Sequence, residues 1–221
     1  PTCVAAEFTT IYQFTATDDC GITATTTANV VITDNTAPDW IVALPANVVA
    51  ECDGAGNTGE LQTWLSDWED LANVSDDCSA VTISSTLDNF APGSCPGNSV
   101  ATYEFTATDI CGNMSTRSGT FTIEDTTNPV ITCPTDSVTV ACTADFSPGT
   151  LGFASGTDAC SNLTTPTFSD ASMPSTLDPL VEEITRTWMI SDICGNTSTC
   201  IQTIFRNDDQ DPVLVAAPQN R

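Results

Sequence analysis

The chain has 221 residues, of which 29 are acidic and 4 are basic, so its formal net charge is −25. Such a surface repels phosphate backbones and anionic lipid headgroups, which excludes nucleic acid and membrane surfaces as expected partners. Histidine and lysine are absent, and with them the usual general bases, zinc ligands and Schiff-base nucleophiles, so we do not expect an enzyme.

An acidic Cys-Gly turn follows a strand-like run three times, and each turn is followed by an Asp-containing linker that ends in proline. The cysteine steps are 111 − 20 = 91 and 194 − 111 = 83 residues, and the proline steps are 129 − 38 = 91 and 212 − 129 = 83. Because both markers shift together, they define an internal repeat. The turns and prolines are Cys20-Gly21 with Pro38, Cys111-Gly112 with Pro129, and Cys194-Gly195 with Pro212.

The repeat predicts where the domains begin and end. Residues 1–37 match the C-terminal half of a repeat, 38–128 and 129–211 are complete repeats, and 212–221 start the next one. We therefore expect a longer natural chain that is built from such modules in series, as in a stalk, fibre or adhesive surface.

Short runs rich in Thr, Val and Ile alternate in apolar and polar character, for example at 100–107, 120–123 and 184–190. Gly, Pro, Asn and Asp clusters separate these runs at intervals of about ten residues, which is typical of antiparallel sandwiches. The predicted fold class is all-β: tandem immunoglobulin-like antiparallel β-sandwiches, stapled by disulfides, with one short helix inserted in the middle repeat.

The predicted helix covers 60–71, where apolar residues recur at helical spacing. It carries Trp64 and Trp68 on one face. Two interpretations are open for this pair of tryptophans: an exposed binding patch, or a stripe that packs into the core.

Eleven cysteines without paired CxxC spacing indicate disulfides in an oxidising compartment. Cys133 and Cys200 lie in the first and last strands of one repeat, and the middle repeat lacks both, so we expect them to bridge. That bond closes a loop of 67 residues (200 − 133), worth roughly 4 kcal/mol in the chain-entropy model. Cys194 is the one cysteine without a predicted partner. It is a buried thiol, it links the chain to another chain, or its lack of a partner shows that the predicted pairing is wrong. Position in the repeat predicts the remaining pairs as Cys52–Cys78, Cys142–Cys160, Cys95–Cys111 and Cys3–Cys20.

The linkers and turns also supply candidate metal ligands. Calcium takes six to eight oxygen ligands, and acidic linkers between sandwiches offer carboxylates and carbonyls. The linkers weakly resemble the calcium-binding junctions of cadherins, while the alternative is that each Asp only caps a turn. The candidate residues are Asp34, Asp125 and Asp208 in the linkers and Asp18, Asp109 and Asp192 in the turns.

Strands ending in Thr-Ala-Thr-Asp-x-Cys-Gly, the linker 124–129 and the segment 131–134 together resemble hyalin-repeat (HYR-like) modules. More narrowly, they resemble the Cys-rich tandem modules of giant surface adhesins that gliding bacteria export by the type IX secretion system. The resemblance covers essentially the whole chain. It implies an immunoglobulin-like fold, an extracellular location at the cell surface, and a part in adhesion, motility or an appendage.

Two functional hypotheses follow. The first is a structural and adhesive stalk, whose partners are neighbouring repeats and other copies in a fibre. The second is a calcium-dependent module that recognises a surface glycan or protein. Exposure of the two tryptophans favours the second hypothesis, and their burial favours the first.

Overall fold

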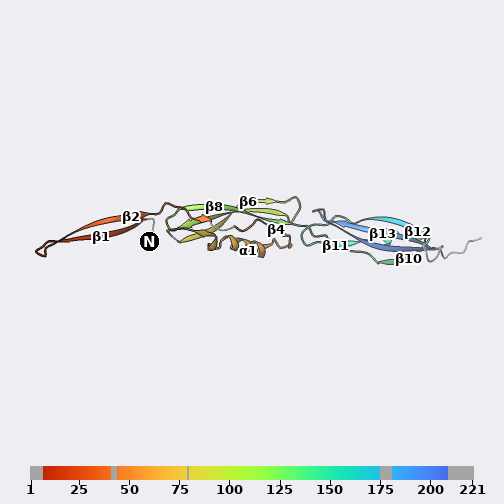
Figure 1. Ribbon diagram of the computed structural model, residues 1–221. Helices are drawn as coiled ribbons and strands as arrows, with labels where there is room; N and C mark the ends of the chain where they lie inside the picture. Colours follow the sequence, from red (N-terminus) through yellow and green to blue (C-terminus); the bar gives the residue numbers. More distant parts are fainter. Residues whose placement is uncertain (1–6, 41–43, 79, 175–180, 209–221) are drawn as a thin grey trace, which may run out of the picture. The chain divides into compact units, whose positions relative to one another are not determined.

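The computed structural model describes residues 7–40, 44–78, 80–174 and 181–208 (Figure 1). The chain divides into two compact units. Unit 1 comprises Pro1–Gly93 with Asn98–Glu124, and unit 2 comprises Ser94–Gly97 with Asp125–Arg221. The division at residue 125 lies close to the boundary at Pro129 that the repeat predicts.

The first element is a hairpin of two long antiparallel strands, β1 (Glu7–Thr17) and β2 (Thr23–Thr33). Its pairing runs without a shift from Glu7 opposite Thr33 to Thr17 opposite Thr23. This hairpin falls in the predicted half-repeat 1–37. It forms a two-stranded sheet, and its apolar side chains, such as Phe14 at 58 % exposure, stay open to solvent.

Unit 1 also contains a four-stranded and a two-stranded sheet, whose elements are β3 (Asp39–Trp40), β4 (Val48–Glu51), α1 (Thr58–Trp68), the 3₁₀ helix η1 (Leu71–Asn73), β5 (Val74–Ser75), β6 (Val81–Pro92), β7 (Ser99–Asp109) and β8 (Met114–Glu124). The larger sheet has the order β4-β8-β7-β6, and the smaller one pairs β3 with β5. Strands β6, β7 and β8 pair antiparallel, whereas β4 pairs parallel with β8. The predicted antiparallel sandwich is confirmed in unit 1 apart from this one pair, in which the first and last strands of the sheet in chain order, β4 and β8, run in the same direction.

Helix α1 supplies the core of unit 1. It begins after Asn57, which adopts a left-handed φ of 52° and donates from Nδ2 to the Glu51 carbonyl at 2.7 Å. Trp64 and Trp68 are 4 % and 2 % exposed and form one cluster with Phe105, Phe121 and Ala50. The core interpretation of the two tryptophans is thus confirmed. The helix ends at Trp68 rather than at residue 71, and η1 follows it.

Gly119 on β8 allows α1 to approach the sheet closely. A Cβ at this position would lie 2.8 Å from an atom of the Trp68 ring and 2.9 Å from one of the Trp64 ring. We expect Gly119→Ala to lower the free energy of unfolding of unit 1 by about 1–3 kcal/mol, the usual cost of overpacking. Gly59→Ala, in the first turn of α1 with open space around its Cβ, is the control and should be neutral or stabilising. Equal melting temperatures for the two variants in thermal denaturation would contradict this packing.

Unit 2 repeats the architecture with β9 (Val130–Thr132), β10 (Ser137–Ala141), α2 (Pro148–Leu151), β11 (Ser155–Thr157), β12 (Thr167–Pro174), β13 (Val181–Ser191) and β14 (Thr197–Asn207). Its larger sheet has the order β10-β14-β13-β12, and β9 pairs with β11. Strand β10 is parallel to β14, as β4 is to β8. The four-residue helix α2 follows β10, as α1 follows β4 in unit 1. The sequence predicted a helix in the middle repeat alone, so the short helix of this repeat was not expected.

A buried arginine takes part in the core of unit 2. Arg186 is 1 % exposed and donates from Nε and Nη2 to the two carboxylate oxygens of Asp170, both at 2.8 Å. Its guanidinium lies 4.6 Å from the centroid of the Phe168 ring. Bidentate pairing satisfies a charge that would otherwise be costly to bury. Around it, Trp188, Ile184, Ile190 and Ile204 are nearly inaccessible to solvent.

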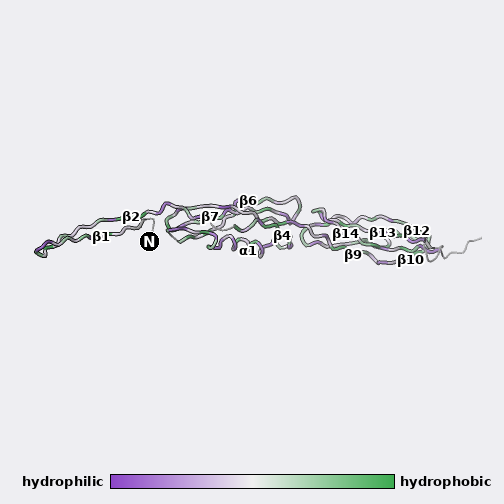
Figure 2. The backbone as a smooth tube through the Cα atoms, in the orientation of Figure 1, coloured by the Kyte–Doolittle hydropathy of each residue, from purple (hydrophilic) through white to green (hydrophobic). Residues whose placement is uncertain are grey.

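Hydrophobic and hydrophilic residues are interspersed along the long strands rather than gathered in blocks (Figure 2). The two complete repeats are immunoglobulin-like β-sandwiches. Their strands β7 and β14 alternate between more and less buried residues, as the sequence predicted, whereas β12 is exposed along its length. Among the described residues, no helix is both long and apolar enough to cross a membrane.

Candidate metal centre

The acidic Cys-Gly turns of the two units have the same hydrogen bonds. Asp109 accepts from the backbone N–H and from Nδ2 of Asn113, both at 2.8 Å. Asp192 accepts from the same two groups of Asn196, again at 2.8 Å. Burial acts to raise the pKa of each aspartate, but these hydrogen bonds outweigh it and hold the pKa below its ordinary value. Both aspartates are therefore charged at neutral pH.

The asparagine of each turn also holds the linker that precedes the sandwich of its own unit. Asn113 Nδ2 donates to the Asp34 carbonyl at 3.2 Å, and Asn196 Nδ2 donates to the Asp125 carbonyl at 3.1 Å. Ser115 adds a bond from its hydroxyl to the Pro38 carbonyl at 2.5 Å. Residues 79 and 71 apart in sequence thus meet at the same kind of joint in both units.

In unit 1 this joint brings two predicted ligands together. The candidate ligand atoms of Asp34, Asp109 and Cys111 all lie within 4.8 Å of one another. Asp34 is 6 % exposed, and its Oδ1 accepts from the Thr36 backbone at 3.0 Å. Its Oδ2 is buried and has no hydrogen-bond partner among the described residues.

A third aspartate, Asp76, lies near Asp34 and was not among the ligands predicted from the sequence. Asp34 and Asp76 line one cavity of about 210 Å³, together with Thr36, Ala37, Asp39, Ser75, Asp77 and Cys78. Asp76 lies in the segment Asp76-Asp77-Cys78, which matches Asp158-Ala159-Cys160 in the next repeat. That recurrence was the sequence signal that could have identified it. We call Asp34, Asp76 and Asp109 the aspartate cluster of unit 1.

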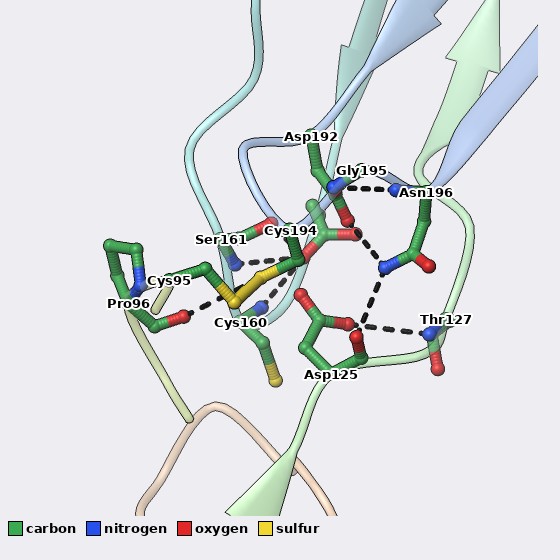
Figure 3. The surroundings of a disulfide bond; sticks show 11 residues. Cys95, Pro96, Asp125, Thr127, Cys160, Ser161, Asp192, Cys194, Gly195 and Asn196 are labelled. Carbon is green, nitrogen blue, oxygen red and sulfur yellow. Dashed lines mark hydrogen bonds between the residues drawn. A yellow bond between two sulfur atoms is a disulfide. The ribbon is translucent and has the colours of Figure 1, made fainter. Parts of the chain in front are cut away.

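Unit 2 has the corresponding aspartate cluster, formed by Asp125, Asp158 and Asp192. Ligand atoms of Asp125, Asp192 and Cys194 lie within 4.8 Å of one another. Burial raises the pKa of Asp125, and the nearby charges of Asp158 and Asp192 raise it further, although Ser161 and Thr127 donate hydrogen bonds to it. Figure 3 shows Asp125 and Asp192 side by side, with Asn196 between the linker and the turn.

Among the described residues, the two remaining predicted ligands, Asp18 and Asp208, belong to no such cluster. Asp18 lies at the exposed tip of the β1–β2 hairpin, where its Oδ1 accepts from the backbone of Cys20 and Ile22 at 2.9 and 2.8 Å. It caps the turn, as the alternative interpretation expected. Asp208 is exposed at the end of the described residues, and the repeat that would follow it, at 212–221, lies outside them.

Two disulfides have described partners. Cys133 is bonded to Cys200, as the sequence predicted. Cys95 is bonded to Cys194 across 99 residues, with the two Cα atoms 5.2 Å apart (Figure 3). The expected Cys95–Cys111 bond is therefore wrong, and Cys194 is not the unpaired cysteine of the chain. Equal spacing in two repeats suggested a bond within one hairpin, whereas the fold places Cys95 against the turn of the next repeat.

The other expected pairs are also wrong. Cys52 and Cys160 are both disulfide-bonded, but Cys78 and Cys142 carry thiols, so neither Cys52–Cys78 nor Cys142–Cys160 is formed. Cys20 is an exposed thiol at the hairpin tip. Its expected partner, Cys3, lies outside the described residues.

Peptide mapping tests the Cys95–Cys194 bond directly. Cleavage after arginine and glutamate, without reduction, places Cys95 with Cys78 in residues 70–104, Cys111 in 105–117, and Cys194 with Cys200 in 187–206, where Cys200 also holds 125–182 through Cys133. We expect 70–104 and 187–206 to appear in one disulfide-linked species by mass spectrometry. A species that joins 70–104 to 105–117 instead would restore the pairing that sequence spacing suggested.

No protein-family model matches this chain. No curated protein matches it either. Among solved structures it is similar to Drosophila N-cadherin EC1-4, at 12 % identity and a TM-score of 0.28, with 90 % of this chain and 58 % of that chain covered. Mouse Protocadherin-24 EC1-3 is similar at 10 % identity and a TM-score of 0.30, over 93 % and 80 % of the two chains. Protocadherin Gamma B2 extracellular cadherin domains 1-5 give 13 % and 0.32, over 92 % and 46 %. The chain thus spans less than two thirds of N-cadherin EC1-4.

Proposed function

We propose that this chain is a structural and adhesive segment of an extracellular array, in which disulfide-stapled β-sandwiches follow one another along one polypeptide. The observation that carries the proposal is the repetition of one module with one joint. Both units have a four-stranded sheet in which the first strand in chain order pairs in parallel with the last, β4 with β8 in unit 1 and β10 with β14 in unit 2. In both, an asparagine of the Cys-Gly turn binds the linker aspartate. A module that repeats its joint as well as its fold is suited to serial extension.

The covalent connections of the chain support a mechanical role, in which the repeats transmit a pulling force. The loop 94–97 belongs to unit 2, although the strands β6 and β7 that it joins belong to unit 1. The Cys95–Cys194 bond fixes this loop within unit 2. When the chain is pulled from its two ends, force therefore passes from one repeat to the next through the disulfide, which bypasses the backbone at residues 124 and 125.

Location and partners follow from chemistry and from the sequence resemblance. Disulfides persist in oxidising compartments, which supports an extracellular position for the array. The resemblance to HYR-like adhesin modules supports the surface of a gliding bacterium and export by the type IX secretion system. The partners are then neighbouring repeats of the same chain and other copies in a filament, and the role is binding and support rather than catalysis.

Divalent cations, of which calcium is the first candidate, are the proposed cofactor at the acidic joints. The alternative function, calcium-dependent recognition of a glycan or protein, loses its aromatic platform because Trp64 and Trp68 are buried. That burial favours the structural hypothesis over the recognition hypothesis.

Single-molecule stretching of the chain from its two ends tests the mechanical role. The Cys95–Cys194 bond removes 99 residues from the load path, which corresponds to roughly 330–360 Å of extended chain. We expect the reduced chain to reach a contour length greater by at least about this amount than the oxidised chain. Equal contour lengths before and after reduction would show that no disulfide shares the load, and would contradict the proposal.

A further inference from the structure

We propose that unit 1 binds a hard divalent cation of the calcium class at Asp34, with the carboxylates of Asp34 and Asp76, which line one cavity, and of Asp109, which lies beside Asp34, as ligands. The inference deepens the proposed function, on which it rests only for the biological use of the ion. The site itself is built from one compact unit and stands on the geometry of that unit.

The buried oxygen of Asp34 is the first reason. A carboxylate that is removed from water needs a hydrogen-bond donor or an opposite charge for each buried oxygen. Asp34 is 6 % exposed, and Thr36 satisfies its Oδ1 at 3.0 Å. Its Oδ2 has no hydrogen-bond partner among the described residues. A cation in the adjoining cavity would supply the missing interaction.

The charge around the cavity is the second reason. Four carboxylates line it, those of Asp34, Asp39, Asp76 and Asp77, and Asp109 approaches Asp34 from the turn. None of the residues that line the cavity is basic. The lining itself therefore offers no positive charge to balance these carboxylates, and a bound cation would supply one.

The third reason is the size of the cavity and the kind of atoms around it. Its volume of about 210 Å³ exceeds that of one ion, since a water molecule occupies about 30 Å³. The remaining space admits waters, which complete a coordination shell of six to eight oxygens around calcium. Thr36 and Ser75 add hydroxyl and carbonyl oxygens to the lining.

The cysteine beside the aspartates in each unit indicates whether the site suits a hard ion such as calcium or a soft ion such as zinc. Cys111 lies within ligand distance of Asp34 and Asp109, as Cys194 does for Asp125 and Asp192. The Cys194 sulfur, however, is part of a disulfide, and only a thiolate is a good ligand for zinc. A site that recurs in both units is therefore an oxygen site, which calcium prefers over zinc.

Binding would connect three segments that are distant in sequence. The linker contributes Asp34, the loop after β5 contributes Asp76, and the end of β7 contributes Asp109. Because these segments come together only in the folded unit, an ion held there stabilises the folded state by linkage. The cation would thereby order the linker that connects the β1–β2 hairpin to the sheets that follow it in unit 1.

Isothermal titration calorimetry of the oxidised 221-residue chain with calcium chloride, after removal of metals by a chelator, tests the site. Asp34→Asn keeps an oxygen for the Thr36 N–H but removes the charge. We expect this variant to bind calcium at one site at least about tenfold more weakly than the parent chain. The matched control is Asp88→Asn, an exposed acid on β6, which should bind as the parent does.

Asp76→Asn provides a second ligand variant, since its Oδ1 still accepts from the Cys78 N–H and folding is retained. Circular dichroism without calcium checks that each variant is folded. Absence of binding heat in the parent, equal affinities of Asp34→Asn and Asp88→Asn, or binding of zinc without calcium would each overturn the proposal. The stretching experiment is done without added calcium, so its outcome is independent of this one.

Discussion

Replacement of Trp68 by alanine is expected to lower the free energy of unfolding of unit 1 by about 3–5 kcal/mol, the usual cost of deleting a buried tryptophan. Trp68 is 2 % exposed. Its ring stacks on Phe105 with centroids 4.4 Å apart and meets the edge of Trp64 at 6.1 Å. Because the neighbouring rings belong to the sheet and to the same helix, they cannot collapse fully into the space that alanine leaves.

Urea denaturation followed by circular dichroism measures this loss, with Phe90→Ala as the control. Phe90 is an aromatic residue of the same unit, but it is 58 % exposed, so its removal should change stability by no more than about 0.5 kcal/mol. A cost for Trp68→Ala as small as that of Phe90→Ala would mean that α1 does not form the core. It would also return the two tryptophans to the role of a binding patch.

Loss of the Cys133–Cys200 bond is expected to have a comparable effect on unit 2. The bond joins the residue after β9 to the middle of β14 and closes a loop of 67 residues. In the chain-entropy model, a loop of this length stabilises the folded state by about 4.4 kcal/mol. The double variant Cys133→Ser, Cys200→Ser should therefore unfold at much lower denaturant concentration than the parent chain.

The matched control for this variant is Cys142→Ser, because Cys142 lies in the same unit as a thiol. It removes a sulfur without opening a loop, and we expect a change of no more than about 0.5 kcal/mol. Chemical denaturation of the oxidised chains distinguishes the two. If the double variant were as stable as the control, the loop would not restrict the unfolded chain, and the stability of unit 2 would rest on its packing alone.

Several features of this protein could be predicted from the sequence because local chemistry determines them. Alternating Thr, Val and Ile runs specify half-buried strands, and the spacing of apolar residues around Trp64 specifies a helix. The Asp-x-Cys-Gly turns form in all three copies because the aspartate accepts backbone N–H groups within four residues of itself. The repeat period also identified Asp34, Asp109, Asp125 and Asp192, since it marks linkers and turns that recur together.

The choice among cysteine partners could not be predicted in the same way. A disulfide requires Cα atoms within about 7 Å, and sequence spacing says nothing about distances between segments 99 residues apart, such as those that carry Cys95 and Cys194. Spacing favoured the nearer Cys111, because the same interval occurred in two repeats.

The sequence alone determined the repeat, the strands, the helix and the turn aspartates, because each of these depends on periodicity or on bonds between near neighbours. The tertiary structure alone decided that β4 runs parallel to β8, that Cys95 meets Cys194, and that Asp76 and Asp34 line one cavity. These features depend on which distant segments pack together. That choice is made by the burial of apolar faces over the whole unit, which no short stretch of sequence contains.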